Sequence, residues 1–266
     1  MVIDALGRPV PLRGRPTRVV SLVPSLSELV CSLGCAASLV GVSDFCVHPA
    51  EALAGLPRVG GQKDPDLDRL LGLRPDLVLC AKEENLRRDV LRLEEAGVPV
   101  YVTDVRTIEA ALALPGELGP ILGAVPARVQ AVHQAMLAGV EEARRRRAGR
   151  RPMRVLVPVW RDPWIVAGPD TYIDAVIALL GADNLARQLP ASALRRYPKA
   201  EAGALRALAA ECVLLPSEPY PFSEADLGPV AGELGAPPRL CDGTVLCWYG
   251  PRMARLPELA DLLAGP

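Results

Sequence analysis

The feature that most constrains the fold of this chain is a strand-then-helix pattern repeated in its first hundred residues. Residues 18–24 form an apolar, β-branched run, and residues 26–34 have the pattern of a helix that ends at Gly34. Ser25 or Ser27 is expected to cap this helix. A second unit places a helix over 66–72 before a buried strand at 76–80. Such alternation predicts an α/β fold with mainly parallel sheets that are covered on both faces.

Ligands of open α/β sheets bind at the carboxyl ends of the strands. In this sequence those ends fall at Val23–Ser25, Val42–His48 and Ala81–Asn85. We therefore expect a ligand-binding site to be assembled from the loops that contain these residues.

The remaining pattern predicts a second, similar domain after a helical segment. In the first part, strands are expected at 18–22, 39–42, 76–80 and 98–102, helices at 26–34, 66–72, 84–96 and 107–114, and a hairpin that turns at Gly7 in 1–17. Residues 120–148 have helical apolar spacing, with a helix over 126–147. A strand at 154–159 opens a second domain, which continues with helices at 171–180 and 201–209, strands at 212–215 and 239–241, and a helix at 252–264. The predicted domains are 1–119, a linker helix within 120–150, and 151–266.

Composition and charge narrow the class of protein. Apolar residues make up 50% of the chain and charged residues 23%, which fits a globular protein with an ample core. The formal net charge of −1 gives no reason to expect a nucleic acid as partner. The arginine run 144–147 is interpreted as a solvated helix end, where cations favour the helix dipole. Nothing in the pattern predicts an oligomer, so a monomer is expected.

The seven cysteines and the N-terminus bear on location. Their odd number and apolar settings favour reduced, buried thiols. Cys31, Cys35 and Cys46 leave a soft-metal or redox site open, but no ligand set is completed by spacing, so no metal site is predicted. Residues 1–8 lack a basic segment followed by an apolar one, which predicts no signal peptide. The chain as it stands is therefore expected in the cytoplasm, and in the periplasm or at the cell surface if a leader was removed.

Aromatic residues form only 4% of the chain, and most of them follow predicted strands of the second domain. Three strand-end loops carry them, and they are expected to form a broad aromatic wall suited to a large flat ligand such as a corrin, haem or catecholate. The predicted ligand contacts in these loops are Trp160, Trp164, Tyr220, Phe222, Trp248 and Tyr249. Tyr172, at a helix start, and Arg252 are added to the same set. The alternative is that these rings only pin loops to the core.

The first domain contributes polar candidates. Lys82 and Asn85 follow the strand at 76–80, and either contact a ligand or, for Asn85, cap the next helix. His48 follows the strand at 39–42 and is one of two histidines in the chain. It is predicted as a ligand contact, with a packed or capping role as the alternative.

These same residues carry a family resemblance. Segments spread over nearly the whole chain resemble the substrate-binding proteins of ABC importers for vitamin B12 and ferric siderophores: Arg18–Ser25, Leu39–Asp44, Leu56–Gly61, Pro65–Cys80, Tyr172–Asn184, Arg196–Pro198 and Trp248–Arg252. The resemblance implies two three-layer lobes joined by one long rigid helix, with the ligand held between the lobes and no covalent cofactor.

The resemblance also implies the function and the partner. The expected ligand is a cobalamin-like corrinoid, bound without catalysis, or alternatively a ferric siderophore or haem. In the family, an acidic residue on each lobe meets basic residues of the importer's membrane subunits. Asp68 matches the first, whereas Gly203 occupies the second position and Glu201 is the nearest acidic residue. Because of that departure and the missing leader, the sequence leaves open whether an importer is the partner.

Two other classes of function stay open on the sequence alone. The first is an enzyme that inserts a metal into a tetrapyrrole, with His48 and Glu83 or Glu84 as the reacting pair. The second is a protein-interaction module in which the aromatic loops form a surface patch. The absence of a nucleophile motif or a glycine-rich phosphate loop favours a protein without catalytic activity.

Overall fold

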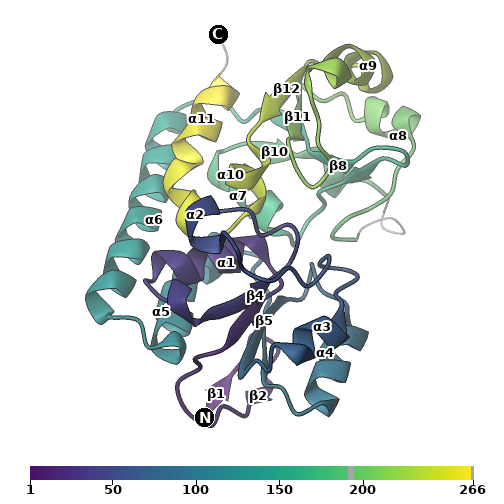
Figure 1. Cartoon of the computed structure of the whole chain (residues 1–266). Helices are drawn as coiled ribbons and strands as arrows, with labels where there is room; N and C mark the ends of the chain where they lie inside the picture. Colours follow the sequence, from purple (N-terminus) through teal and green to yellow (C-terminus); the bar gives the residue numbers. More distant parts are fainter. Residues whose placement is uncertain (191–194, 265–266) are drawn as a thin grey trace. The chain divides into compact units, whose positions relative to one another are not determined.

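The computed structural model describes residues 1–190 and 195–264, and shows an α/β protein with two parallel sheets (Figure 1). The chain forms two compact units. Unit 1 contains Met1–Val105 and Leu112–Gln134, and unit 2 contains Arg106–Ala111 and Ala135–Pro266. The helices α5 (Ile108–Leu122) and α6 (Pro126–Arg147) therefore contribute residues to both units. The division into 1–119, 120–150 and 151–266 stays a prediction.

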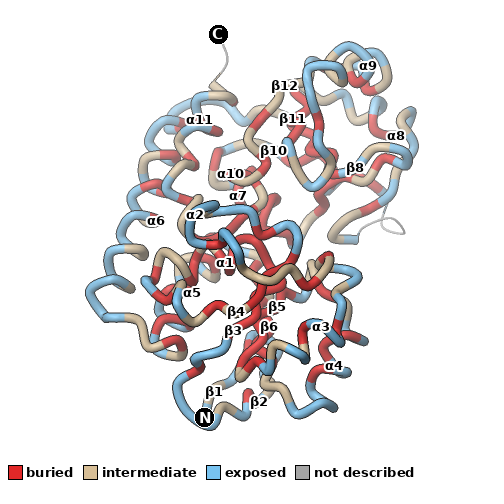
Figure 2. Tube along the Cα trace, viewed as in Figure 1, coloured by how far each residue is buried: buried red, intermediate tan, exposed pale blue. Residues whose placement is uncertain are grey.

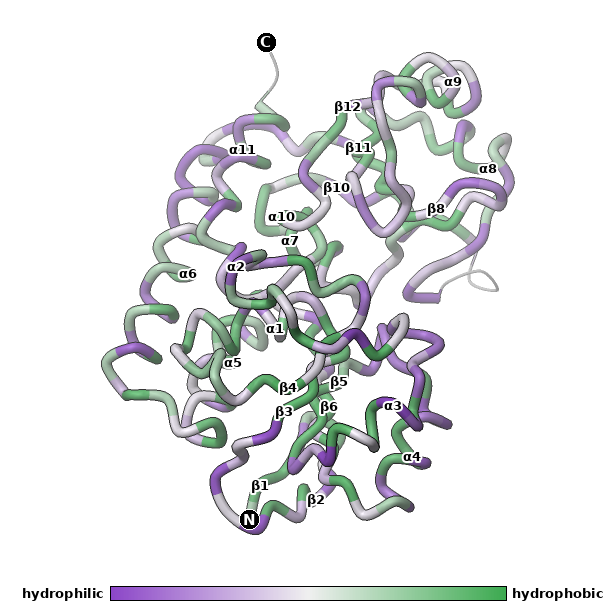
Figure 3. The backbone as a smooth tube through the Cα atoms, viewed as in Figure 1, coloured by the Kyte–Doolittle hydropathy of each residue, from purple (hydrophilic) through white to green (hydrophobic). Residues whose placement is uncertain are grey.

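Unit 1 is built on a four-stranded parallel sheet in the order β4-β3-β5-β6. Its strands are β3 (Val19–Ser21), β4 (Leu39–Val42), β5 (Leu77–Ala81) and β6 (Val100–Thr103), as the apolar runs predict. All five residues of β5 are buried, and Figure 2 shows the same for its neighbours. Figure 3 shows these strands as hydrophobic. A strand that is apolar on both faces fits only a sheet covered on both sides.

The predicted helices of unit 1 are present as α1 (Pro24–Ser32), α3 (Leu67–Gly72) and α4 (Arg87–Glu95). The structure adds the short helix α2 (Ala50–Leu53) and the 3-10 helix η1 (Ala36–Ser38). The predicted hairpin is β1 (Val2–Ile3) and β2 (Pro9–Val10), and Gly7 turns it with φ of 76°. The amide of Ala5 donates to the carbonyl of Val102, 3.2 Å away, which joins the hairpin to the edge of the sheet.

The expected serine cap of α1 is wrong. The helix begins at Pro24 with Val23 as N-cap, and no side chain caps it. Proline is suited to the first helical position because its fixed φ matches the helix and its missing N–H needs no partner there. Ser27 instead lies inside the helix and donates to the carbonyl oxygen of Val23, 3.1 Å away. Gly34 does end the helix, with φ of 75°.

Unit 2 repeats the architecture with the parallel order β10-β7-β11-β12. These strands are β7 (Arg154–Leu156), β10 (Asp183–Asn184), β11 (Cys212–Pro216) and β12 (Pro238–Cys241). A separate antiparallel pair joins β8 (Pro158–Trp160) to β9 (Ile165–Val166). The helices are α7 (Tyr172–Leu179), α8 (Ala202–Ala207), α9 (Glu224–Leu234), α10 (Gly243–Cys247) and α11 (Leu256–Ala264), with 3-10 turns η2 (Leu185–Gln188) and η3 (Pro251–Arg255).

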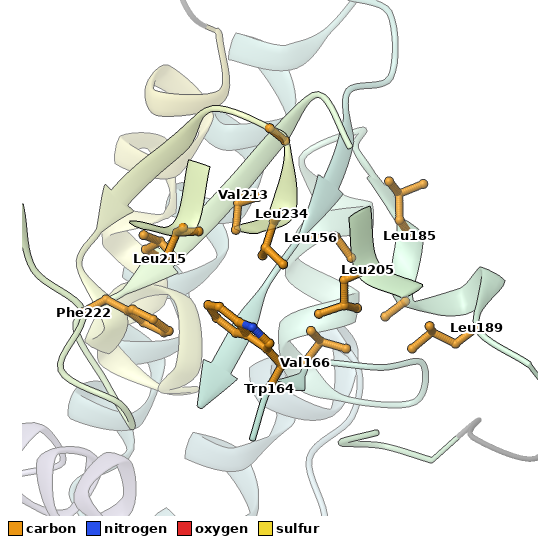
Figure 4. Packing of buried hydrophobic residues seen from close by; sticks show 13 residues of the cluster. Leu156, Trp164, Val166, Leu185, Leu189, Leu205, Val213, Leu215, Phe222 and Leu234 are labelled. Atoms are coloured by element: carbon orange, nitrogen blue, oxygen red, sulfur yellow. The ribbon is translucent and has the colours of Figure 1, made fainter. Parts of the chain in front are cut away.

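The core of unit 2 packs α8 and α9 against β7, β9 and β11 (Figure 4). Leu156, Val213 and Leu215 of the sheet are fully buried, and Leu205 and Leu234 of the helices meet them. The sequence signal for α9 is weak because Gly228, Pro229 and Gly232 interrupt its helical pattern. In the described ranges, no helix is long and apolar enough to cross a membrane.

Helix α6 packs closely on η3 through Gly139. This glycine is buried, and a Cβ atom placed there would overlap the carbonyl oxygen of Met253 and lie 2.6 Å from the Cα of Ala254. Because the clashing atoms belong to the backbone, no side-chain rotation can make room for a methyl group.

We predict that Gly139→Ala lowers the free energy of unfolding by about 2 kcal/mol, since the two backbones must separate. Chemical denaturation followed by circular dichroism measures the change. Gly232→Ala is the matched control: this helical glycine has nothing within 4 Å of a new Cβ, so alanine should stabilise the protein by about 0.5 to 1 kcal/mol. Equal effects of the two substitutions would contradict the prediction.

Candidate ligand-binding site

The strands of unit 1 end at one edge of the sheet, where two of the predicted loops lie. His48 is exposed in the loop that follows β4. The guanidinium of Arg58 fixes this loop, because its Nη1 donates to the carbonyl oxygens of Ser43 (3.1 Å) and Cys46 (2.6 Å). The loop is therefore anchored through its backbone, while the side chain of His48 stays exposed.

The loop after β5 is held by Asn85. Its side-chain oxygen accepts from the amide of Ala81 (2.8 Å), and its side-chain nitrogen donates to the carbonyl of Gln62 (3.0 Å). The expected helix cap is wrong, because Leu86 is the N-cap of α4 and no side chain caps it. Lys82 lies beside Asp104, with 3.1 Å between Nζ and Oδ2. Asn85 thus braces the loop, and ligand contacts by Lys82 and Asn85 stay predictions.

Sequence reasoning missed Phe45 in the His48 loop. Its side chain is 58% exposed, and Val47 beside it is 50% exposed. Two exposed apolar side chains at the carboxyl end of a buried parallel strand are a signal for ligand contact. That signal was available, since Phe45 is one of only two phenylalanines in the chain.

The first aromatic cluster of unit 2 contains Trp160, Trp164, Tyr220 and Phe222. Trp160 meets Tyr220 edge to face at 5.5 Å between ring centroids, and Tyr220 lies 4.5 Å from Phe222. Trp164 stacks on Phe222 at 6.4 Å, and each of these two is only 5% exposed. Figure 4 shows Trp164 and Phe222 among the core leucines and valines. Trp160, at 44% exposure, presents the largest free surface of the cluster.

A second aromatic cluster contains Tyr172, Trp248 and Tyr249, all buried. Tyr172 meets Tyr249 edge to face at 5.8 Å, and the guanidinium of Arg252 lies 5.3 Å from the centroid of the Trp248 ring. The hydroxyl of Tyr172 is buried and has no hydrogen-bond partner among the described residues. Burial raises the pKa of this phenol, so it stays protonated. A ligand carbonyl is the kind of group that would satisfy it.

Arg161 is held by acidic residues of α9. Its Nη1 donates to Asp226 (3.1 Å) and its Nη2 to Glu233 (2.5 Å). Glu233 also accepts from the indole N–H of Trp164 at 3.2 Å. Two carboxylates on one guanidinium leave a net negative charge, which disfavours an anionic ligand such as a ferric catecholate at this place.

The cysteines are free thiols in the structure. Burial raises the pKa of Cys31 and of Cys212 to about 11, and it also raises the pKa of Cys46. Hydroxyls of Ser27 and Ser43 lie 3.1 Å from the Cys46 sulfur. Protonated thiols are poor metal ligands, and within the described ranges no group of three or more His, Cys, Asp or Glu side chains can hold a metal ion.

The two residues predicted to dock a partner are both exposed. Asp68 lies in the first turn of α3 and lines a polar cavity of about 350 Å³. The other residues that line it are Asp64, Pro65, Asp66, Leu67, Arg88, Asp89 and Arg92. Glu201 is the N-cap residue of α8, and its side chain makes no cap hydrogen bond.

Glu218 is a functional candidate that the sequence pattern did not single out. It follows β11 and packs against the first turn of α10, where a Cβ on Gly243 would lie 2.6 Å from its Cγ. Burial raises the pKa of this carboxyl to about 7, and the Asp242 carboxylate adds to the rise. The hydrogen bond from Trp248 and the charge of Arg252 oppose it. Glu218 thus exchanges its proton near neutral pH, beside the second aromatic cluster.

We predict that Glu218 destabilises the fold as the pH rises. A carboxyl whose folded pKa lies above its unfolded value favours folding at low pH, and this contribution is lost between about pH 4.5 and pH 7. Between pH 5 and pH 8 the wild type should lose about 2 kcal/mol of unfolding free energy relative to Glu218→Gln. Urea denaturation of both proteins across this range measures it, and a pH-independent difference would refute it.

Comparison with known proteins relates this arrangement to a known family. The periplasmic binding protein family matches residues 19–218 of the 266. The vitamin B12-binding protein of Pectobacterium carotovorum subsp. carotovorum (strain PC1) is 27% identical over 197 residues, which cover 70% of each chain. The vitamin B12-binding protein of Yersinia pestis (strain Pestoides F) is 29% identical over 171 residues, covering 63% of this chain and 59% of that protein.

Solved structures show the same fold. A periplasmic heme-binding protein from Pseudomonas aeruginosa has a TM-score of 0.78 and 28% identity, covering 93% of this chain and 92% of that one. The periplasmic vitamin B12-binding protein BtuF of Vibrio cholerae has a TM-score of 0.79 and 20% identity, covering 95% and 99%. The last comparison supports the fold alone. The family match over most of the sequence shows that this chain belongs to the periplasmic binding proteins.

Proposed function

We propose that this chain binds a cobalamin-like corrinoid without catalysis. The observation that carries the proposal is the similarity to vitamin B12-binding proteins over 63 to 70% of the chain, together with exposed rings after the strands of both units. Trp160 and Phe45 offer large apolar surface at these ends, which suits a broad, flat macrocycle.

The polar candidates of each unit suit the periphery of a corrinoid. A corrin ring carries amide side chains, whose carbonyls accept hydrogen bonds. The buried hydroxyl of Tyr172 is a donor that has no partner among the described residues, and a buried donor gains most from being satisfied. Lys82 and His48 are the proposed polar contacts from unit 1, and Arg252 with the ring of Trp248 from unit 2.

We further propose that the chain acts in the periplasm and delivers its ligand to the membrane subunits of an ABC importer. Support comes from the family, whose name gives that location. The reduced thiols, on which the cytoplasmic prediction rests, are largely buried and have raised pKa values. Such thiols react slowly in an oxidising compartment also. The exposed Asp68 and Glu201 are the proposed docking charges.

We predict that cobalamin binds with micromolar or tighter affinity and that Trp160→Ala weakens it by about tenfold, because the variant loses exposed ring surface. Isothermal titration with cobalamin measures both values, and quenching of tryptophan fluorescence provides a second signal. Val125→Ala is the control, since Val125 is 66% exposed but lies in the turn between α5 and α6, outside the loops that follow the strands. Absence of saturable binding would exclude the corrinoid and direct the search to haem and ferric siderophores.

We predict that Asp68→Arg leaves cobalamin affinity unchanged but abolishes uptake, because charge reversal repels basic residues of a membrane partner. The measurement is cobalamin-dependent growth of a strain that relies on this chain for uptake. Glu95→Arg provides the control, as Glu95 is an exposed acidic residue at the end of α4. Normal growth with Asp68→Arg, or equal loss with Glu95→Arg, would contradict the docking role of Asp68.

A further inference from the structure

Residues 57–63 of unit 1, which we call the strap, join two loops at the carboxyl edge of its sheet. The strap begins as a strand beside β4. The amide of Val42 donates to the carbonyl oxygen of Pro57 (3.0 Å), and the amide of Val59 donates to that of Val42 (3.0 Å). Arg58 and Val42 pair in the parallel sense. The strap therefore runs in the direction of β4 and leaves the sheet at the edge where the strands end.

The first part of the strap holds the loop that follows β4. The amide of Asp44 donates to the carbonyl oxygen of Gly60 (2.9 Å), and the guanidinium of Arg58 donates to two more carbonyls of this loop. The exposed ring of Phe45 lies against the strap, because its Cε2 atom is 3.5 Å from the position of a Cβ on Gly61. The strap thus sets both the backbone of this loop and the ring that the loop presents.

The other end of the strap meets the loop that follows β5. The side-chain nitrogen of Asn85 donates to the carbonyl oxygen of Gln62 (3.0 Å), and the ammonium of Lys63 donates to that of Glu83 (2.6 Å). The side chain of Gln62 also donates to the carboxylate of Glu84. Because β3 lies between β4 and β5 in the sheet, the strap must cross the carboxyl end of β3 to make these contacts.

A tight turn fixes the path of the strap. Gly60 has φ of 84°, and a Cβ there would lie 2.9 Å from the carbonyl oxygen of Asp64 and 3.0 Å from the amide nitrogen of Asp66. The amide of Asp66 donates back to the carbonyl oxygen of Val59 (2.8 Å). Close packing of this kind lets a displacement at one end of the segment reach the other.

We propose that the strap makes the loops after β4 and β5 one preformed binding surface, in which Arg58 and Asn85 are positioning residues that act through Phe45. The effect on ligand rests on the proposed function, whereas the coupling of the two loops does not. A preformed surface loses less conformational entropy when a ligand binds. Release of either end of the strap should therefore weaken binding, although neither positioning side chain has to touch the ligand.

The coupling is tested first in the ligand-free protein. Asn85→Asp removes the donor to the strap and keeps an oxygen that accepts from the amide of Ala81. The amide of Asp44, in the other loop, should then exchange with deuterium about tenfold faster. The amide of Val78, which donates to a carbonyl inside the sheet, should keep its rate. Hydrogen exchange followed by nuclear magnetic resonance measures both amides.

Asn184→Asp is the matched control. Asn184 is also buried, and its side-chain nitrogen donates to the carbonyl oxygen of Ala167 in unit 2 at 3.0 Å. The same chemical change there should leave the exchange of Asp44 unaltered. The coupling is overturned by an unchanged Asp44 rate in Asn85→Asp, by equal acceleration in Asn184→Asp, or by a parallel rise at Val78, which would indicate general destabilisation.

The coupling must also act in the opposite direction, because coupling between two sites is reciprocal. Arg58→Gln releases the strap at its first part. The amide of Ala81, which donates to the side chain of Asn85, should then exchange about threefold faster or more. This variant carries the test if Asn85→Asp does not fold. An unchanged rate at Ala81 would overturn the coupling.

Titration with cobalamin separates positioning from direct contact. Asn85→Asp should weaken binding about tenfold in the wild-type background and have little effect in a Phe45→Ala background, because the two residues act as a unit. Equal loss in both backgrounds would show that Asn85 contacts the ligand itself and would overturn its positioning role. If the wild type does not bind cobalamin, the proposed function fails, and hydrogen exchange still decides whether the strap couples the loops.

Discussion

The burial of parallel strands on both faces is the constraint on which the rest of this structure depends. β5 and β11 are buried along their whole length, so side chains on these strands have no access to ligand. Polar and aromatic groups can reach solvent only where the strands end. Within each unit, the carboxyl ends of the strands therefore carry almost all the chemistry: the His48 and Asn85 loops in unit 1, and the aromatic loops in unit 2.

The parts of the fold that sequence predicted are those set by local pattern. β5 follows from an uninterrupted apolar run, the hairpin from Gly7, and α6 from helical spacing that ends before Pro152. Side-chain partnerships were less predictable. Asparagine commonly caps helices, but Asn85 instead braces a loop by donating to the carbonyl of Gln62, 23 positions away. Such contacts depend on how distant segments meet, which no local pattern contains.

Trp160 and Trp164 show the same limit at the candidate site. Both stand in one short motif after a strand, and the sequence gives no reason to separate them. The antiparallel pairing of β8 and β9 separates them, since Trp160 pairs with Ile165 at the end of the ribbon and stays exposed. Trp164 turns into the core, where Phe222 and Glu233 receive its ring and its N–H. Contacts with residues distant in sequence thus decide which side chains of the predicted aromatic wall are exposed and which are buried in the core.

The distribution of charge in unit 2 then bears on the class of ligand. Arg161 faces two carboxylates, so that cluster carries a net charge of −1. A ligand with several negative charges, such as a ferric tris-catecholate, would be repelled by this cluster. A largely neutral macrocycle does not meet this repulsion. Charge, more than ring area, therefore separates the corrinoid from the siderophore.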